Sequence, residues 1–345
     1  MPFDAADLLP TLMRVILPAF GAAMLVSWLM IRVGIMDHPN LRSSHKKPTP
    51  RAGGVGILAG FLAAFFLIEM ERPSDMAVLA GIALSAGLAG VLGLFDDLFT
   101  LSEKLKFAAL SAISLLLAGM AGPVTDLGLP LPWLIGLLGS ALWVFTLVNA
   151  VNFMDGADGF MAATLIPAAL AIGVMGEGPV AIAAIALAAA LAGFAVWNAP
   201  LLSRRGHLFA GDTGSLGTAT IFAGLALAWA SGAAPGTVFL APLLVMPLLG
   251  DVLLTLAARA KARRPLFVAH RAHAYQLMLR MGYTHREVAV FWGGLALVSG
   301  VLALIGAAGP ALFKLLMLAV GASAFTWLHR QIRRRAGQAG LNILD

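Results

Sequence analysis

The sequence predicts an all-α polytopic membrane protein with about 10–11 transmembrane helices. Hydrophobic residues make up 60% of the 345-residue chain and charged residues only 12%, about half the charged fraction of an ordinary soluble domain. The mean hydropathy is +0.91, and one segment after another approaches the roughly 20 apolar residues that a membrane-spanning helix needs. No polar stretch is long enough for a second domain, so residues 1–345 are expected to form a single integral-membrane domain.

Apolar runs bounded by charged residues, proline and glycine define the expected spans in order. The candidates are residues 9–33, 53–70, 76–95, 103–121, 131–150, 160–176, 179–197, 213–231, 236–258, 287–307 and 311–328. No basic region precedes the first apolar run, so this run is expected to be the first span and not a cleaved signal peptide. The chain contains no cysteine, which excludes disulfides and thiolate metal sites.

The basic residues predict the orientation of the chain. All but three of the 23 Lys and Arg residues fall in alternate connections or in the C-terminal tail, the exceptions being Arg14, Arg72 and Lys314. The positive-inside rule then places the N-terminus in the periplasm and the C-terminus in the cytoplasm. The high sequence pI of about 10.2 therefore reflects topology and contact with anionic inner-membrane lipids, and no nucleic-acid partner is expected.

The polar residues of the chain gather at one face of the membrane. Two amides and two carboxylates lie within the segment 149–160, which separates two apolar runs. A simple hinge would need only the glycines of this segment. Further acidic residues are expected at the same cytoplasmic face, whereas the connections on the other face are short and contain no comparable polar cluster. An ion-coupled membrane transporter, the main alternative, would need ionisable groups near the midplane and access from both sides. The pattern favours an enzyme that works at the inner leaflet.

Two clusters in the first half of the chain suit phosphate or metal chemistry. The first cytoplasmic loop combines Lys46 and Arg51 with glycines, which suits a diphosphate because the bases supply charge and glycine allows close backbone approach. The alternative is a basic loop that serves topology only. The adjacent carboxylates of Asp96 and Asp97 could provide a base or help to bind a divalent cation, whereas a helix cap would need only one of them.

Two clusters in the second half complete this polar face. Asp212 lies in a glycine-rich turn that opens a span, where free backbone amides favour an anion, although Asp is also a common N-cap. Phe209 in the same turn could stack on a base or anchor the chain at the interface. His270, Arg271 and His273 could bind phosphate or transfer a proton. The many carboxylates favour a hard cation such as Mg2+ over zinc.

Five motifs follow one another over about residues 35–290. They are RSSHKKPTPRAGG, FDDLFTLSEKLKF, NAVNFMDGADGF, FAGDTGSLG, and Asp251 followed by HRAH. With these motifs the chain resembles the polyprenyl-phosphate N-acetylhexosamine-1-phosphate transferases of glycosyltransferase family 4. It resembles their O-antigen-initiating type, which is related to the phospho-N-acetylmuramoyl-pentapeptide transferases. A CDP-alcohol phosphatidyltransferase is disfavoured, because Asp155-Gly156 is not followed by the Ala-Arg of that signature.

The resemblance implies a reaction and its partners. The expected reaction is transfer of N-acetylhexosamine 1-phosphate from a UDP-N-acetylhexosamine donor to undecaprenyl phosphate, with release of UMP. Mg2+ is the implied cofactor, with Mn2+ as a substitute. The implied location is the bacterial inner membrane, with the active site facing the cytoplasm. Members of the family often form a homodimer, and no segment of this sequence specifies an interface.

The resemblance implies a role for individual residues from their positions in the motifs. Asp212 resembles the Mg2+ ligand of the family, with Asn152 as its companion, and Asp96 and Asp97 match an aspartate pair that activates the acceptor or organises metal and phosphate. The remaining matches concern the substrates. Asp155 and Asp158 match the ribose and uracil end of the nucleotide site, Phe209 a residue that stacks on uracil, Asn198 a nucleotide-binding Asn, and Lys46 a lysine near the substrate. The SRRG before His207 looks like an insertion that blurs the match of Asn198, and the role of Asp251 stays open.

The last motif departs from the pattern of many bacterial relatives. They carry His-x-His-His where this chain has His273-Ala-Tyr275-Gln276, so only His273 is left as a catalytic histidine unless His270 takes the second place. The form resembles that of O-antigen initiators, which start O-antigen or other cell-envelope polysaccharides. The implied donor sugars are N-acetylfucosamine, N-acetylquinovosamine, N-acetylglucosamine and N-acetylgalactosamine.

Overall fold

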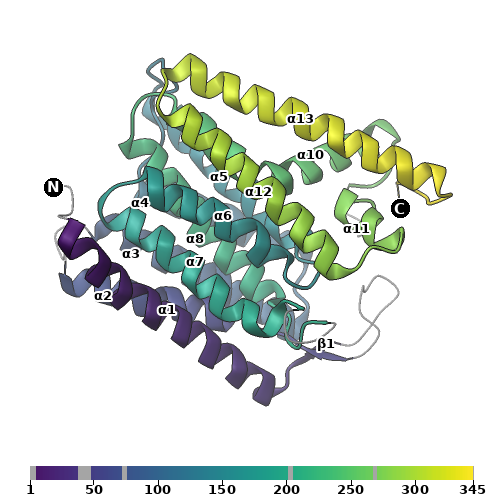
Figure 1. The fold of residues 1–345 in the computed structure, drawn as a ribbon, viewed down its shortest axis with the longest axis horizontal. Helices are drawn as coiled ribbons and strands as arrows, with labels where there is room; N and C mark the ends of the chain where they lie inside the picture. Colours follow the sequence, from purple (N-terminus) through teal and green to yellow (C-terminus); the bar gives the residue numbers. More distant parts are fainter. Residues whose placement is uncertain (1–4, 38–47, 72–75, 201–204, 267–269, 345) are drawn as a thin grey trace.

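The computed structural model is a bundle of long helices that run roughly alongside one another (Figure 1). It describes residues 5–37, 48–71, 76–200, 205–266 and 270–344. The helices are α1 Ala5–Val33, α2 Gly54–Glu71, α3 Ala77–Phe99, α4 Glu103–Ala121, α5 Trp133–Met154, α6 Phe160–Met175, α7 Gly178–Asn198, α8 Gly211–Gly232, α9 Leu240–Leu244, α10 Met246–Lys261, α11 Ala274–Arg280, α12 His285–Ala307 and α13 Ala311–Gln338. Strands β1 Met36–Asp37 and β2 Thr49–Pro50 pair antiparallel.

The predicted all-α membrane fold is confirmed, and every predicted span contains helix. Within the described residues, eight helices are long and apolar enough to cross a membrane, or nine if one bent pair is counted as a span. The predicted spans 53–70 and 160–176 form the shorter apolar helices α2 and α6. Both pack against several neighbouring helices. The orientation of the termini remains a prediction.

The predicted span 236–258 contains helix but is not one straight helix. The chain instead forms the 3-10 helix η2 Thr237–Phe239, then α9, and bends by 78° before α10. Pro247 lies in the first turn of α10, where a proline is tolerated because its missing N–H would have no partner. The break separates a short apolar segment from α10, which carries Asp251 in its second turn.

Helix α8 forms the centre of the bundle. Its whole apolar window is buried, and it packs against α3, α5 and α2. Glycines allow these helices to approach it closely, since a Cβ atom at Gly93 of α3 would lie 2.3 Å from the Asp212 carbonyl oxygen. Small residues at such crossings are typical of membrane helix packing. The start of α8 is therefore held directly against the ends of its neighbours.

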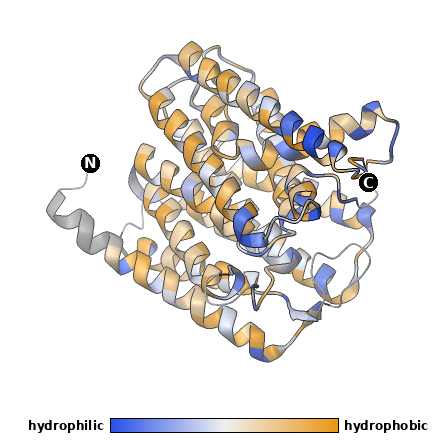
Figure 2. Ribbon diagram, turned by 45° about the vertical axis from the view of Figure 1, so that its right-hand side comes forward, coloured by the Kyte–Doolittle hydropathy of each residue, from blue (hydrophilic) through white to orange (hydrophobic). Residues whose placement is uncertain are grey.

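Polar residues concentrate at one end of the bundle, as Figure 2 shows on its right-hand side. The lengths of the helices are mostly hydrophobic (Figure 2). The polar end carries the end of α3, the end of α5, the start of α8 and all of α11. The protein is thus a multi-pass membrane protein with one polar end, where the candidate site lies.

Candidate functional site

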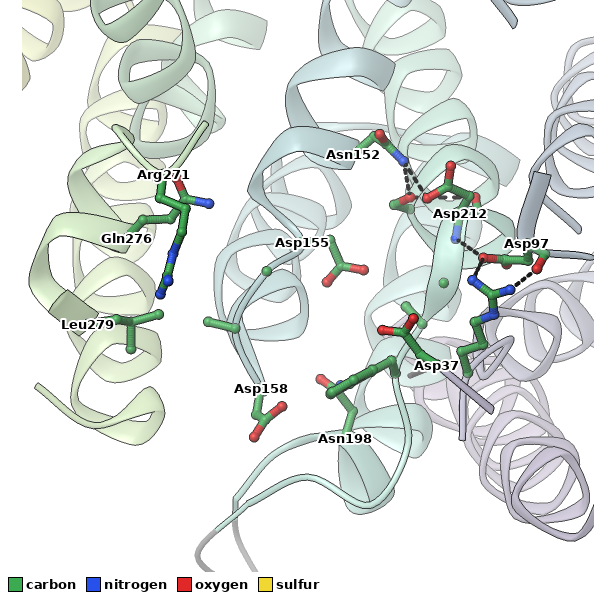
Figure 3. A pocket seen from close by; sticks show the side chains of 17 residues that line it. Asp37, Asp97, Asn152, Asp155, Asp158, Asn198, Asp212, Arg271, Gln276 and Leu279 are labelled. Atoms are coloured by element: carbon green, nitrogen blue, oxygen red, sulfur yellow. Dashed lines mark hydrogen bonds and ion pairs between the residues drawn. The ribbon is translucent and has the colours of Figure 1, made fainter. Parts of the chain in front are cut away.

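A polar cavity of about 260 Å³ opens at this end of the bundle. The ends of several helices and the loops beside them meet around it (Figure 3). Among the described residues, the charged side chains of its lining are five aspartates and two arginines: Asp37, Asp97, Asp155, Asp158, Asp212, Arg51 and Arg271. The excess of carboxylates makes the cavity attractive to a cation, and an anionic diphosphate would need such a cation to enter.

Asp212 and Asn152 lie side by side on one wall. Asp212 belongs to the first turn of α8 and Asn152 to the last turn of α5. The Asn152 Nδ2 donates to Asp212 Oδ1 at 3.1 Å and to Ser215 Oγ at 2.8 Å. Because the amide nitrogen makes both bonds, its carbonyl oxygen stays available together with the Asp212 carboxylate. The structure thus brings the two predicted metal ligands together.

Asp97 fixes the start of α8. Its carboxylate accepts from the backbone N–H groups of Asp212 and Thr213, both at 3.2 Å, and from Thr213 Oγ1 at 3.1 Å. The Arg51 guanidinium lies 3.6 Å from the same carboxylate and also donates to the Asp97 carbonyl oxygen. Gly211 has a φ of +71°, and a Cβ atom there would lie 2.6 Å from Asp97 Oδ2. Only glycine fits this turn, which lets a carboxylate from α3 cap α8.

Asp96 faces a basic side chain and also the metal-ligand candidate. Lys106 Nζ donates to Asp96 Oδ2 at 3.1 Å, and the backbone N–H of Leu101 donates to Oδ1 at 2.7 Å. The carboxyl groups of Asp96 and Asp212 are also close enough to interact directly. The two neighbouring aspartates of α3 therefore differ, because Asp97 binds the backbone at the start of α8, whereas Asp96 contacts Lys106 on one side and Asp212 on the other.

Asp158 and Asn198 join two loops below the cavity. The Asp158 carboxylate accepts from the backbone N–H of Gly206 at 3.0 Å, and the Asp158 N–H donates to His285 Nδ1 at 3.0 Å. Asn198 Oδ1 accepts from the N–H of Gly159 at 2.9 Å, while its Nδ2 donates to the Leu208 carbonyl at 2.9 Å. Both predicted nucleotide-binding residues line the cavity, and both are buried and hold the surrounding backbone in place.

Asp155 lies near the middle of the cavity (Figure 3). Burial, together with the negative charges of Asp158 and Asp97, raises the pKa of Asp155 to about 7. Phe209 lines the same cavity. Its backbone N–H donates to the Pro50 carbonyl, and its carbonyl accepts from Gly53. The segment around Phe209 is thereby joined to the β2–α2 connection that carries Arg51.

The wall opposite Asp212 comes from α11 and the residues before it. Arg271, Gln276 and Leu279 lie on this side, facing Asp97 and Asp212 across the cavity (Figure 3). Tyr275 lies behind them, with its ring buried against Phe160. The pKa of Tyr275 is raised far above its usual value, mainly by burial. Tyr275 packs against Phe160, and its hydroxyl donates to the Phe153 carbonyl oxygen at 3.4 Å. Arg271 provides the cationic group of this wall.

The two histidines of the last motif do not line the cavity. His273 is only 3% exposed, and its Nδ1 lies 3.7 Å from Asp251 Oδ1. His270 is next to it, with ring centroids 4.9 Å apart. Burial is the main cause that lowers the pKa of His270 to about 4, and the positive charges of Arg259 and Arg333 contribute. A catalytic role for His273 remains a prediction, and in this structure the ring packs behind the cavity wall.

Asp251 holds the α11 wall from behind. It is fully buried and accepts from the backbone N–H groups of Ala274 at 2.8 Å and Tyr275 at 3.2 Å. His329 Nε2 of α13 lies 3.3 Å from Asp251 Oδ1. On the same helix, Arg333 donates to the Ala272 carbonyl at 3.0 Å. Helix α13 and Asp251 together set the position of the segment that carries Arg271.

The residues present suit a divalent hard cation. Within the described residues, no group of three or more His, Asp or Glu side chains could hold a metal ion. Mg2+ is typically bound through one or two carboxylates, with water and substrate phosphates completing its shell. The Asp212 carboxylate and the Asn152 carbonyl fit that pattern, because both are oxygen donors in a carboxylate-rich cavity. The predicted Lys46 lies outside the described residues.

Sequence reasoning missed several residues of this region. Ser215, Gln276, Leu279 and Asp37 line the cavity, and all of them except Leu279 belong to stretches that the sequence singled out. His285 is not among the predicted site residues, yet its Nδ1 accepts from the Asp158 backbone N–H. A polar residue one turn after Asp212 was the available signal for Ser215, because it lies on the same face of α8.

Comparison with known proteins identifies the family of the chain. The family model described as glycosyl transferase family 4 matches residues 79–230. The undecaprenyl-phosphate alpha-N-acetylglucosaminyl 1-phosphate transferase of Yersinia pestis is 28% identical, over 82% of this chain and 79% of that protein. The Escherichia coli K12 protein of the same name is 28% identical over 80% and 76%.

A mycobacterial relative is more similar in sequence. The decaprenyl-phosphate N-acetylglucosaminephosphotransferase of Mycobacterium tuberculosis H37Rv is 31% identical, over 78% of this chain and 76% of that protein. These matches extend well beyond the segment of the family model. The chain therefore belongs to glycosyl transferase family 4, as one of its polyprenyl-phosphate hexosamine-1-phosphate transferases.

Proposed function

We propose that the protein transfers N-acetylhexosamine 1-phosphate from a UDP-sugar to undecaprenyl phosphate and releases UMP. An oxygen of the acceptor phosphate attacks the β-phosphorus of the donor and forms a new P–O bond. The bond from that phosphorus to the bridging oxygen breaks, and its electrons leave with UMP. The observation that carries the proposal is the pairing of Asp212 with Asn152 inside a cavity that is rich in carboxylates.

Each wall of the cavity has a task in this proposal. Asp212 and Asn152 would hold Mg2+, and the bound ion would supply positive charge to stabilise the charge that passes to UMP, as metals do in phosphoryl transfer. Arg271 lies on the α11 wall and faces the UDP-sugar. Phe209 and Asp155 form the part of the cavity that binds the nucleoside of this donor. The phosphate monoester of the acceptor is already ionised near neutral pH, so its attack needs no strong base. In this proposal Asp96 and Asp97 therefore organise the site.

The reaction lies at the cytoplasmic face of the bacterial inner membrane in this proposal, and the product starts an O-antigen or another envelope polysaccharide. The relatives named above act with N-acetylglucosamine. The last motif supports the 6-deoxy sugars N-acetylfucosamine and N-acetylquinovosamine as alternatives. N-acetylgalactosamine completes the set to be tested.

The test is UMP release by the purified protein with undecaprenyl phosphate, Mg2+ and each UDP-N-acetylhexosamine in turn. We expect acceptor-dependent UMP from one donor, and a loss on the order of 100-fold or more for Asp212→Asn, which keeps shape but removes the charge. Glu177→Gln is the matched control, because Glu177 is an exposed carboxylate in the α6–α7 connection. Failure of every donor with folded, lipid-supplied protein would contradict the proposal.

A further inference from the structure

The chain turns back after helix α13, toward the cavity wall that carries Arg271. Residues 342–344 lie next to α11 there (Figure 1). The N–H of Leu344 donates to Asn342 Oδ1 at 3.0 Å, which holds these residues in a compact turn. We name residues 342–344 the C-terminal strap. The strap lies behind the wall, and it is not part of the described lining of the cavity.

Each carbonyl group of the strap accepts a hydrogen bond from a different arginine. The pairs are the Asn342 carbonyl with Arg280 Nη1 at 2.9 Å, the Ile343 carbonyl with Arg333 Nη2 at 2.7 Å, and the Leu344 carbonyl with Arg259 Nη1. The three arginines belong to α11, α13 and α10. Three helices therefore hold the main chain of the strap, and they do so without using its apolar side chains.

The same three arginines also hold the residues just before α11. The pairs are Arg280 Nη1 with the Arg271 carbonyl at 3.1 Å, Arg333 Nη1 with the Ala272 carbonyl at 3.0 Å, and Arg259 Nη2 with the Pro265 carbonyl at 2.7 Å. Each guanidinium thus joins one carbonyl of the strap to one carbonyl on the way into α11. Arg271, which lines the cavity, is the residue at the centre of this arrangement.

Burial makes the strap necessary for these contacts. Arg259 is 3% exposed and Arg333 is 8% exposed. A guanidinium carries five N–H donors and no acceptor, and a buried donor without a partner is costly. The strap carbonyls satisfy one donor of each guanidinium with a charge-assisted hydrogen bond, which is stronger than a neutral one. The strap therefore fixes the guanidinium groups in the positions from which they hold the residues before α11.

The backbone around Arg271 is held from two directions. Its own carbonyl and that of Ala272 accept from the arginines, whereas the N–H groups of Ala274 and Tyr275 donate to Asp251. Polar groups of both kinds are thus engaged over five consecutive residues. The Arg271 side chain projects from this fixed backbone into the cavity (Figure 3).

We propose that the C-terminal strap positions Arg271 for the UDP-sugar donor, through the guanidinium groups of Arg280 and Arg333. The proposal rests on the proposed function, in which Arg271 faces the donor. The strap and these two arginines touch no substrate, so they act as positioning residues. Without the strap, the residues before α11 would shift, and the Arg271 guanidinium would meet the donor diphosphate at the wrong distance.

The kinetic test removes residues 342–345 and retains Leu341, whose N–H donates to the Ala336 carbonyl at the end of α13. The donor is the UDP-N-acetylhexosamine that gives UMP in the preceding test. Its KM is expected to rise on the order of ten-fold, while the KM for undecaprenyl phosphate stays unchanged. Ile343→Ala keeps every carbonyl of the strap and should behave like the wild type. A wild-type donor KM in the shortened protein, or an equal rise of both KM values, would overturn the proposal.

Arg333→Met tests the same contact in a chain that keeps the strap. Methionine has an unbranched side chain without any N–H donor, so the Ile343 and Ala272 carbonyls lose their shared partner. The donor KM should rise as it does in the shortened protein. Arg334→Met is the matched control, because Arg334 is the next residue of α13, is exposed and loses the same charge. The same donor KM in both variants would contradict a positioning role for Arg333.

Arg280 offers a conservative rescue. Its Nη1 alone donates to the Arg271 and Asn342 carbonyls, so a single ammonium group at that place can serve both. Arg280→Met should raise the donor KM, and Arg280→Lys should restore most of the wild-type value. If the Met and Lys variants had the same raised KM, side-chain packing and not hydrogen bonding would explain the effect, and the proposal would fail.

Hydrogen exchange follows the wall without turnover and separates this proposal from the proposed function. Removal of residues 342–345 and Arg333→Met should each speed amide exchange in residues 270–280, and Arg334→Met should not. Faster exchange in a protein that releases no UMP from any donor would retain the strap and reject the transferase. Unchanged exchange in both strap variants would overturn the strap, whether or not UMP is released.

Discussion

Two aspartates of the cavity differ because their neighbours differ. Asp97 is 5% exposed and receives hydrogen bonds from two backbone N–H groups and one hydroxyl, beside Arg51. Asp212 receives one from the Asn152 amide and faces other carboxylates. The first carboxylate already has its donors, whereas the second still has capacity for a cation. The two residues are of the same type, so the hydrogen-bond donors and charges around each carboxylate determine its role.

His270 gives a prediction about pH. Its pKa is lowered to about 4 in the folded protein, against roughly 6.5 for a free histidine. The groups around it include His273, Arg259 and Arg333, which disfavour its charge, and Asp251, which favours it. Between pH 6.5 and 4 the unfolded chain binds more protons than the folded one, so folding stability should fall as the pH falls through this window.

The expected loss is on the order of 1 kcal/mol once solvent screening is discounted, because the ring is half-buried. This loss of folding stability is measured by thermal unfolding of the protein in detergent at pH 7.5 and at pH 5. His270→Gln cannot titrate and should lose less stability over the same interval. Equal losses in the wild type and in His270→Gln would show that another group causes the pH dependence.

At the scale of the element, Asp251 connects three parts of the chain that are distant in sequence. It belongs to α10, receives the backbone N–H groups that open α11, and lies beside His329 of α13. Arg259, Arg280 and Arg333 add hydrogen bonds to backbone carbonyls of the C-terminal segment. The wall that carries Arg271 is therefore supported by the last helix and by the end of the chain.

Asp251→Ala should loosen this wall. Removing one partner from a buried charged network costs about 3 to 5 kcal/mol, so we expect a lower unfolding temperature and faster tryptic cleavage after Arg271. His329→Ala leaves the backbone contacts of Asp251 in place and should produce a smaller effect of the same kind. If cleavage after Arg271 stayed at the wild-type rate in Asp251→Ala, Asp251 would not be what holds α11.

At the scale of the whole molecule, the orientation in the membrane can be tested with two cysteines, because the chain has none of its own. Lys261 at the end of α10 and Glu177 before α7 are both exposed. The positive-inside rule places them on opposite faces. In intact spheroplasts, a membrane-impermeant thiol reagent should label Glu177→Cys and should reach Lys261→Cys only after lysis. The reverse pattern would invert the predicted topology.

The membrane fold and most of the site follow from the sequence for one physical reason. In an apolar chain, polar groups such as Asp97, Asn152 and Asp212 stand out because their burial is costly and must be compensated. His285, His329 and Arg333 could not be found in this way, since they belong to basic segments that topology alone explains. The bend before Met246 was missed as well, because hydropathy continues across it while backbone geometry does not.

The complete burial of α8 bears on how the protein is made. A helix without a lipid-facing side does not need a strongly apolar sequence, and α8 has a lower mean hydropathy, 1.3, than most of the long helices. Such a segment leaves the insertion machinery less readily when it is alone. Among the described elements, most of its neighbours precede it in the chain, namely α2 to α7, and only η2 and α9 follow it. During synthesis, α8 therefore inserts between helices that are already in the membrane, and the insertion of α8 brings Asp212 to the ends of α3 and α5.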